Sequence, residues 1–181
     1  MQHKYFRISS FLRISHLKYY STKRTCVYTD GSYMQGQGQR QGGIGIFFAN
    51  DAHTGISENY SMWIDPVKFP PTSNRCELLA IYRAFSICVE NDIYAEIHTD
   101  SEYAIKSVVN YAPLWNKNGW YKMDGKPVKN IDLILPLYLI YVKTGDQFIF
   151  KHVKAHQNPN VSIHAFGNNI ADQYAKMGIY K

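Results

Sequence analysis

The alternation of apolar and polar residues predicts a short β-strand that begins at Cys26 and ends at Asp30. A period of two places Cys26, Tyr28 and Asp30 on one face of this strand. Gly31 and Ser32 then allow the backbone to turn sharply. An Asp at a strand end lies at the rim of a sheet, where its carboxylate can reach a ligand. The plain alternative is that Asp30 only opens the turn.

The pattern along the rest of the chain predicts two more strands and then helices that alternate with strands. Residues 33–42 are rich in Gln and Gly and predict a loop, and Pro136 limits where the helix around it can begin. The clearest helix has apolar residues at helical spacing and Thr72 or Ser73 as its N-cap. The further predicted strands are 43–49, 58–64, 94–99 and 147–153, and the predicted helices are 73–89, 100–110, 132–143 and 167–177.

This order of elements predicts an α/β layered domain with a mixed five-stranded sheet and helices on both faces. The first three strands form an antiparallel meander. The later strands alternate with helices, which indicates parallel pairing. A length of 181 residues fits one domain with a real core.

Four acidic residues lie where their side chains can meet at one edge of this sheet: Asp30, Glu77, Asp100 and Asp172. Each has a plain explanation: Asp100 fits a helix N-cap and Glu77 is favoured by the helix dipole. Together they would repel one another and raise their own pKa values, which divalent cations relieve. Oxygen ligands suit Mg²⁺ or Mn²⁺. Two such ions about 4 Å apart would clamp the attacking water and the leaving oxygen of a phosphodiester.

Residues 113–130 interleave aromatic side chains with lysines. This composition suits a sugar–phosphate backbone, through stacking and charge. The alternative is a solvated loop with a small hydrophobic anchor. The residues concerned are Trp115, Lys117, Trp120, Tyr121, Lys122, Lys126 and Lys129.

Charge and cysteine content exclude several classes of protein. Of the net charge of +6, all belongs to residues 1–29, which hold six basic residues and no acid. A high isoelectric point is therefore no argument for nucleic-acid binding by the rest of the chain. Three cysteines without a CxxC pair argue against a disulfide framework and a zinc cluster, and indicate a reducing compartment. No apolar run approaches the ~20 residues of a membrane span, so we expect no membrane association.

Residues 1–24 form a basic extension that precedes the domain of residues 25–181. Their Arg, Lys and Ser content and lack of acid predict a mitochondrial transit peptide that is removed after import. One alternative is a retained basic arm that binds phosphates, and another is a disordered start with no role. In either of these cases the protein would be nuclear or cytoplasmic.

Several short motifs, taken together, resemble the type 1 ribonuclease H family over about residues 25–178. Each motif alone is weak, but in the family's order and with compatible spacing they form a strong signal. The motif Tyr-Thr-Asp-Gly-Ser is followed by Thr-Ser-Asn-Arg-Cys-Glu-Leu and Thr-Asp-Ser-Glu-Tyr. The segments are Tyr28–Ser32, Thr72–Leu78, Thr99–Tyr103, Trp115–Trp120, Gly125–Asp132, Val153–His156 and Gly167–Asp172.

This resemblance implies a ribonuclease H-like fold and hydrolysis of the RNA strand of an RNA–DNA hybrid, with 5′-phosphate and 3′-hydroxyl products. It implies that the four carboxylates hold two Mg²⁺ ions, with Mn²⁺ as a substitute. His156 would lie on a mobile loop and assist proton transfer or product release. We expect a monomer that binds the hybrid duplex.

The resemblance also assigns substrate contacts. Asn74, with the backbone near Gly31 and Ser32, would contact the RNA 2′-hydroxyls, which distinguish RNA from DNA. Other residues would hold DNA phosphate or extend the grip on the backbone: Thr72, Arg75, Asn130, Trp115, Lys117, Trp120 and Lys129. Binding should read the shape of the hybrid and weaken with salt.

The chain departs from the family pattern at a few positions. Ala155 replaces a glycine before the loop histidine, Ser73 replaces an asparagine, and Asn169 replaces a glutamate. The stretch from His156 to the last carboxylate is also long and holds a second candidate, His164. We prefer His156 because Val-Lys-x-His fits the motif. No departure removes a metal ligand, so we expect an active enzyme.

Two other functions fit the same fold. A non-catalytic nucleic-acid-binding module would keep the fold without the chemistry, but it would have no reason to keep four mutually repelling carboxylates. The other is the ribonuclease H part of a reverse transcriptase or an integrase-like strand-transfer enzyme. The basic segment of residues 113–130 favours a stand-alone enzyme.

Overall fold

A computed structural model of the chain describes residues 24–36, 39–49 and 60–180. Nearly all of the predicted transit peptide, residues 1–24, lies outside these residues. The mitochondrial location therefore stays a prediction.

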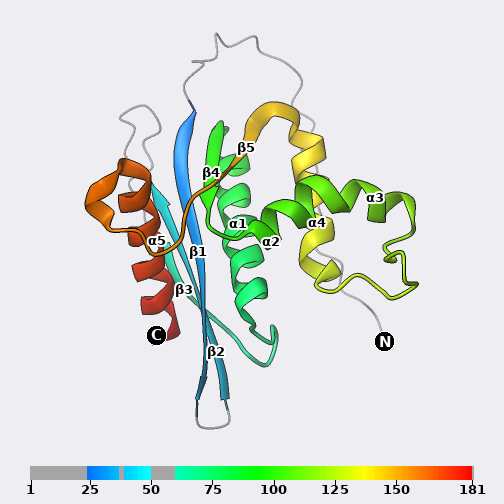
Figure 1. The fold of residues 1–181 in the computed structure, drawn as a ribbon, viewed down its shortest axis with the longest axis horizontal. Coiled ribbons are helices and arrows are strands. Elements are labelled where there is room, and N and C mark those ends of the chain that lie inside the picture. Colours follow the sequence, from blue (N-terminus) through cyan, green and yellow to red (C-terminus); the bar gives the residue numbers. More distant parts are fainter. Residues whose placement is uncertain (1–23, 37–38, 50–59, 181) are drawn as a thin grey trace.

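Five strands form one mixed sheet with the order β3-β2-β1-β4-β5 (Figure 1). β1 pairs antiparallel with β2, and β2 pairs antiparallel with β3, as the sequence predicted. β4 lies parallel to both β1 and β5, which confirms the parallel pairing of the later strands. The strands are β1 Thr25–Gly36, β2 Gln39–Phe48, β3 Tyr60–Ile64, β4 Ala95–Thr99 and β5 Phe148–His152.

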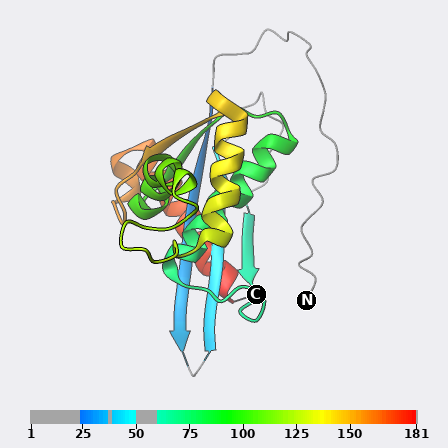
Figure 2. The same cartoon turned by 90° about the vertical axis from the view of Figure 1, so that its right-hand side faces the viewer.

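Helices cover both faces of this sheet, which confirms the predicted fold class. α5 packs on one face, and α1 packs on the other with α4 outside it (Figures 1 and 2). α2 and α3 are joined through a π-helical segment, Lys106–Tyr111, into one longer helical run. The α-helices are α1 Ser73–Glu90, α2 Glu102–Ile105, α3 Ala112–Lys117, α4 Ile131–Thr144 and α5 Ile163–Ile179.

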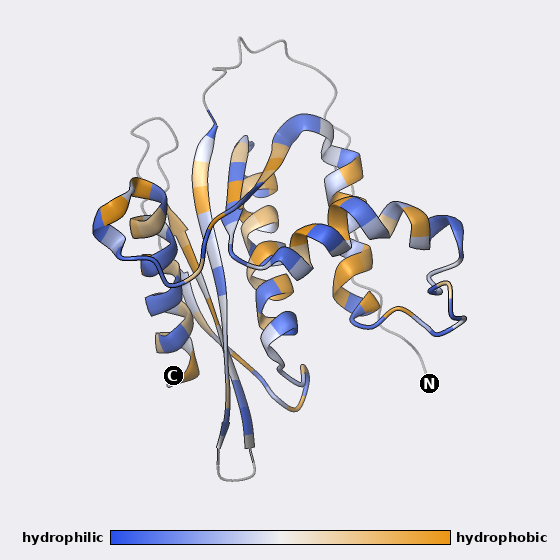
Figure 3. Cartoon of the chain, in the orientation of Figure 1, coloured by the Kyte–Doolittle hydropathy of each residue, from blue (hydrophilic) through white to orange (hydrophobic). Residues whose placement is uncertain are grey.

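The main hydrophobic core lies between the sheet and α1 and continues to α4. Its apolar residues gather on the strands and on these two helices, whereas several turns of α5 are hydrophilic (Figure 3). Burial of large apolar side chains is the main force that holds the layers together. The largest members of this core that are almost completely buried include Phe48, Leu78, Ile81, Phe85, Ile97, Ile134, Leu137 and Phe148.

The first strand is longer than the sequence predicted, and this is a correction. Asp30 lies in the middle of β1, opposite Gly45 of β2, and no turn follows at Gly31 and Ser32. The predicted loop of residues 33–42 is largely strand, because β1 and β2 continue their pairing to Gly36 and Gln39. Regular pairing with a neighbouring strand outweighs the weak strand preference of Gln and Gly.

Several helix boundaries also differ from the prediction. The N-cap of α2 is Ser101, whose Oγ accepts a hydrogen bond from the Ala104 backbone. Asp100 therefore does not serve as the N-cap, and its carboxylate is left for other contacts. α5 begins four residues earlier than expected, behind the N-cap Ser162, which places His164 in a helix instead of a loop. Among the residues that the structure describes, none of the helices has the length and apolar character that crossing a membrane requires.

Gly31 sets the distance between β1 and α1. A Cβ at this position would overlap the backbone nitrogen of Glu77 and the carbonyl carbon of Cys76. Only a residue without a side chain lets the start of α1 approach β1 this closely. The same close approach brings the side chain of Glu77 beside Asp30.

We expect Gly31→Ala to lower the free energy of unfolding by about 1–3 kcal/mol, the usual cost of overpacking a tight contact. It should also displace Glu77. Urea unfolding measures the first effect, and Gly36→Ala on the same strand is the matched control, because nothing lies within 4 Å of a Cβ there. Equal stability of the two variants would contradict this account of the β1–α1 contact.

Candidate active site

Three carboxylates from separate elements meet beside the middle of β1, where the shorter strand β4 ends. Asp30 comes from β1, Glu77 from α1, and Asp100 follows the last residue of β4. One carboxylate oxygen from each lies within 4.8 Å of those of the others. Asp30 and Glu77 are each only 8 % exposed. The predicted convergence of these three acids is therefore present in the fold.

Burial and mutual repulsion make this group electrostatically costly. Burial first, and then the charges of Asp100 and Asp172, raise the pKa of Asp30 to about 6. Burial and the charges of Asp30 and Asp100 raise the pKa of Glu77 well above its ordinary value. Groups with such shifts in a cleft are typical of functional sites.

The donor set fits a hard divalent cation. All three ligand groups are carboxylates, the kind of oxygen donor that Mg²⁺ and Mn²⁺ prefer. Oε2 of Glu77 is buried and has no hydrogen-bond partner in the structure. A buried polar atom without a partner is costly, and a bound cation would satisfy it.

Asp172 lines the same cavity from α5. The cavity has a volume of about 400 Å³ and is lined by all four predicted carboxylates. Asp172 is held by Lys176 of the next helical turn, with Nζ 2.6 Å from Oδ2. Gly45 explains the close approach of α5, because a Cβ there would overlap the backbone of Ala171.

His156 and His164 lie in different places. His156 lines the carboxylate cavity and is exposed, with a left-handed backbone at φ 51°. His164 instead shares a hydrogen bond of 3.0 Å with the hydroxyl of Tyr28 and stacks on His98, with ring centroids 4.6 Å apart. Of the two histidines, only His156 is among the residues that line this cavity.

Of the substrate contacts predicted around the start of α1, some line the cavity and others lie in the first turn of the helix or at its cap. Gly31 and Ser32 line the cavity, and Asn74 is exposed in the first turn of α1. Thr72 is the N-cap of α1, and its Oγ1 accepts a hydrogen bond from the backbone of Arg75.

Arg75 is held by neighbours within the protein. Its guanidinium donates to both carboxylate oxygens of Asp132, at 2.9 and 2.6 Å, and to Oδ1 of Asn130 at 3.4 Å. Asn130 has a left-handed backbone at the start of α4, and its amide donates to the hydroxyl of Tyr103 at 2.9 Å. Arg75 and Asn130 therefore form one connected polar group.

In residues 113–130 the tryptophans differ from the lysines. Trp115 and Trp120 are partly buried and pack against the hydrophobic core. Lys117 and Lys129 are exposed. The alternative of a loop with a hydrophobic anchor thus describes the two tryptophans, while the lysines remain available to a phosphate backbone.

Comparison with known families decides the assignment. The family model described as RNase H matches residues 22–180, which is nearly the whole chain. The chain belongs to the RNase H family. The resemblance seen in the sequence motifs is confirmed, and the four carboxylates lie in that matched region.

Relatives of the RNase H family support the same placement. The ribonuclease H of Rickettsia akari is 33 % identical over 155 residues, which cover 86 % of this chain and 90 % of the relative. The ribonuclease H of Schizosaccharomyces pombe is 33 % identical over 156 residues, or 86 % of this chain. The solution structure of the PFV RNase H domain superposes with a TM-score of 0.72 at 26 % identity, covering 87 % of this chain and 94 % of that one.

Some of these relatives are longer. The match spans about half the length of the relatives from Streptomyces coelicolor and Schizosaccharomyces pombe, at 50 % and 53 %.

Two residues of this RNase H site were not singled out from the sequence. Asn168 is 5 % exposed, and its amide donates to Oδ2 of Asp100 at 3.3 Å. Lys176 pairs with Asp172 across one turn of α5. The contact between Asp172 and Lys176 could have been predicted, because residues four positions apart lie side by side on a helix. Nothing local in the sequence predicts the other contact, because Asn168 and Asp100 meet only through the packing of α5.

Proposed function

We propose that this chain is an endoribonuclease that hydrolyses the RNA strand of RNA–DNA hybrids and leaves 5′-phosphate and 3′-hydroxyl ends. The observation that carries the proposal is the meeting of Asp30, Glu77 and Asp100 within 4.8 Å, with Asp172 on the same cavity. Membership of the RNase H family, and relatives named ribonuclease H, support it.

The four carboxylates would hold two Mg²⁺ ions, for which Mn²⁺ can substitute. When bound, these ions supply Lewis-acid stabilisation of the phosphodiester oxygens and a more nucleophilic water at neutral pH. Burial and mutual repulsion raise the pKa values of Asp30 and Glu77, and these shifts support the role because a bound cation offsets both the buried charge and the repulsion. A module that only bound nucleic acid would have no use for such a costly group.

The protein's own residues orient the carboxylates and can transfer protons at this site. Asn168 orients Asp100 through its hydrogen bond, and Lys176 holds Asp172. His156 lines the cavity from an exposed loop, where an imidazole can give or take a proton or help a product leave.

Recognition of the hybrid would use the surface around the start of α1. Asn74 and the backbone of Gly31 and Ser32 would contact RNA 2′-hydroxyls. Thr72 and Asn130 would contact DNA phosphate. Arg75 would act mainly by holding Asn130 in place, because both of its terminal nitrogens already bind Asp132.

Exposed lysines would extend the contact with the phosphate backbone. Lys117 and Lys129 are the candidates, with Trp115 and Trp120 as the anchors that fix their segment to the core. Phosphate contacts of this kind read no sequence and weaken with salt. We propose that the protein acts on the hybrid as a monomer.

The direct test is strand-specific cleavage. With Mg²⁺ present, we expect the purified full chain to cut labelled RNA paired to DNA and to leave single-stranded RNA, RNA duplex and the DNA strand intact. End-group analysis of the fragments should give 5′-phosphates. Cleavage of RNA duplex at a similar rate, or no cleavage with either Mg²⁺ or Mn²⁺, would overturn the proposal.

The two histidines give a matched pair of variants. His156→Ala is expected to lower turnover by about 10²-fold, which is typical for loss of a general acid–base group. His164→Ala should leave turnover near that of the wild type, because His164 binds Tyr28 away from the carboxylates. Steady-state kinetics on one hybrid substrate measures both, and the reverse order of effects would show that His164 is the functional residue.

A further inference from the structure

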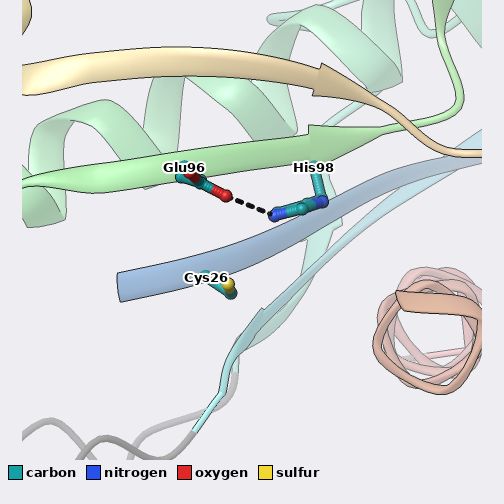
Figure 4. A group of neighbouring side chains, drawn as sticks. All are labelled: Cys26, Glu96 and His98. Atoms are coloured by element: carbon teal, nitrogen blue, oxygen red, sulfur yellow. Dashed lines mark ion pairs between the residues drawn. The ribbon is translucent and has the colours of Figure 1, made fainter. Parts of the chain in front are cut away.

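A second group of metal-ligating side chains lies on β1 and β4, outside the carboxylate site. It consists of Cys26 on β1 and of Glu96 and His98 on β4 (Figure 4). Cys26 stands directly opposite Glu96 in the parallel pairing of the two strands, and His98 follows two residues later on the same face. The sequence spacing gives no sign of this group, because its members meet only when the two strands pair.

The separations within the group are those of ligands around one ion. A ligand atom from each residue lies within 4.8 Å of those of the others. Nε2 of His98 is 3.5 Å from Oε2 of Glu96. Two ligands on a tetrahedral Zn²⁺ with bonds of about 2.0–2.1 Å lie about 3.4 Å apart, so this pair is already spaced to share an ion.

The buried imidazole of His98 lacks hydrogen bonds. The residue is 3 % exposed, and neither ring nitrogen has a hydrogen-bond partner in the structure. Its separation from Glu96 is too long for a normal hydrogen bond between an imidazole and a carboxylate. A buried imidazole whose ring nitrogens have no partner can offer a nitrogen lone pair to a metal.

The donor types select the class of metal. One thiolate, one imidazole and one carboxylate match Zn²⁺ and related transition metals, whereas Mg²⁺ avoids sulfur and nitrogen. The thiolate and the carboxylate together balance the charge of a dication. Glu96 keeps 30 % of its side chain exposed, so a water or another small ligand can reach the fourth position.

We propose that Cys26, Glu96 and His98 form a binding site for a thiophilic divalent metal of the Zn²⁺ class. Binding replaces the thiol proton of Cys26 with a sulfur–metal bond and releases that proton to solvent. The ion would tie β1 to β4, the two strands that also position Asp30 and Asp100. This site shares no ligand with the carboxylate cavity, and it does not depend on the proposed nuclease function.

The test is a Co²⁺ titration of the full chain in excess Mg²⁺, followed by the sulfur-to-cobalt charge-transfer absorption. Mg²⁺ occupies the carboxylates and does not compete for a thiolate. We expect one equivalent of Co²⁺ to produce the band and Zn²⁺ to abolish it by displacement. Absence of the band in the wild-type protein would overturn the proposal.

Variants assign the band to its ligands. Cys26→Ser should remove it, and Glu96→Gln should weaken Co²⁺ binding by at least about tenfold. Cys88→Ala is the matched control, because Cys88 is fully buried in the main core and should leave the band unchanged. A band that survives Cys26→Ser, or one that disappears with Cys88→Ala, would refute the assignment.

A second measurement does not rely on cobalt. In excess Mg²⁺, added Zn²⁺ should raise the melting temperature of the wild-type protein and of Cys88→Ala, because it binds only the folded chain. The melting temperature of Cys26→Ser should not respond. An equal response in Cys26→Ser would place Zn²⁺ binding elsewhere and contradict the proposal.

Discussion

Asp30→Asn is expected to lower the rate of hybrid cleavage by on the order of 10³-fold, while binding to the hybrid is retained. Loss of one carboxylate from a metal site removes several kcal/mol of transition-state stabilisation, and each tenfold in rate is about 1.4 kcal/mol. The substitution keeps the size of the side chain and removes only its negative charge, which lies close to the charges of Glu77 and Asp100. Single-turnover cleavage and a binding assay in Ca²⁺ separate the two effects.

Asp146→Asn is the matched control for this result. The side chain of Asp146 is 85 % exposed, and its contact with Arg24 at 3.8 Å is a surface ion pair of little energetic value. Its cleavage rate should equal that of the wild type. If Asp30→Asn cut the hybrid at the wild-type rate, the assignment of the metal site would fail.

The same Asp30→Asn substitution is expected to stabilise the metal-free protein at pH 7, by up to about 3 kcal/mol. The folded state raises the pKa of Asp30 from 3.8 to about 6, and one pKa unit corresponds to about 1.4 kcal/mol. The ionised carboxylate therefore destabilises the fold at neutral pH, and asparagine removes that charge. Urea unfolding in EDTA measures the difference between the variant and the wild type.

The pH dependence of this difference has a defined sign. A carboxylate whose pKa is raised on folding contributes stability below its unfolded pKa and loses it as the pH rises through the folded value. The advantage of Asp30→Asn should therefore be largest at pH 7 and shrink as the pH falls through about 6 toward 4. His98 changes stability in the opposite direction over this range, but it is common to both proteins and cancels in the difference.

Mg²⁺ should reverse the order of the two proteins. A cation that binds only the folded wild-type site stabilises it in proportion to the logarithm of its concentration, and the variant should gain less. If Asp30→Asn were less stable than the wild type in EDTA at pH 7, burial and repulsion of the ionised Asp30 carboxylate would not be the dominant electrostatic effects at the site.

The comparison of sequence and structure separates local signals from those of packing. The helix behind Thr72 and the strand before Asp100 follow from apolar periodicity and capping, and both lie close to where they were expected. The turn after Asp30 was wrong because strand pairing beyond Gly31 overrode the local turn chemistry. Pro136 lies inside α4. The helix continues through it because the buried side chains of Leu133, Ile134 and Leu137 pack α4 against the core.

The site shows the same division. The four carboxylates could be chosen from their positions at strand and helix boundaries and from the motifs around them. The motif already favoured His156 over His164, and His156 lines the cavity. The position of His164 beside Tyr28 could not be predicted, because it depends on α5 starting behind Ser162. The assignment of Arg75 to phosphate stays a prediction, and the structure adds a partner that the sequence did not show: each terminal nitrogen also donates to Asp132, a contact that crosses from α1 to α4.

The layered α/β fold, the order of its strands and helices, and the acids that could share a cation could all be inferred from the residues alone. These depend on period, capping and motif order, which are properties of short segments. The close approach of α1 and α5 to β1 and β2, at Gly31 and Gly45, depends on how the elements pack in space. The same holds for the meeting of Cys26 with Glu96 and His98, because contacts between distant strands depend on backbone pairing that no single segment encodes.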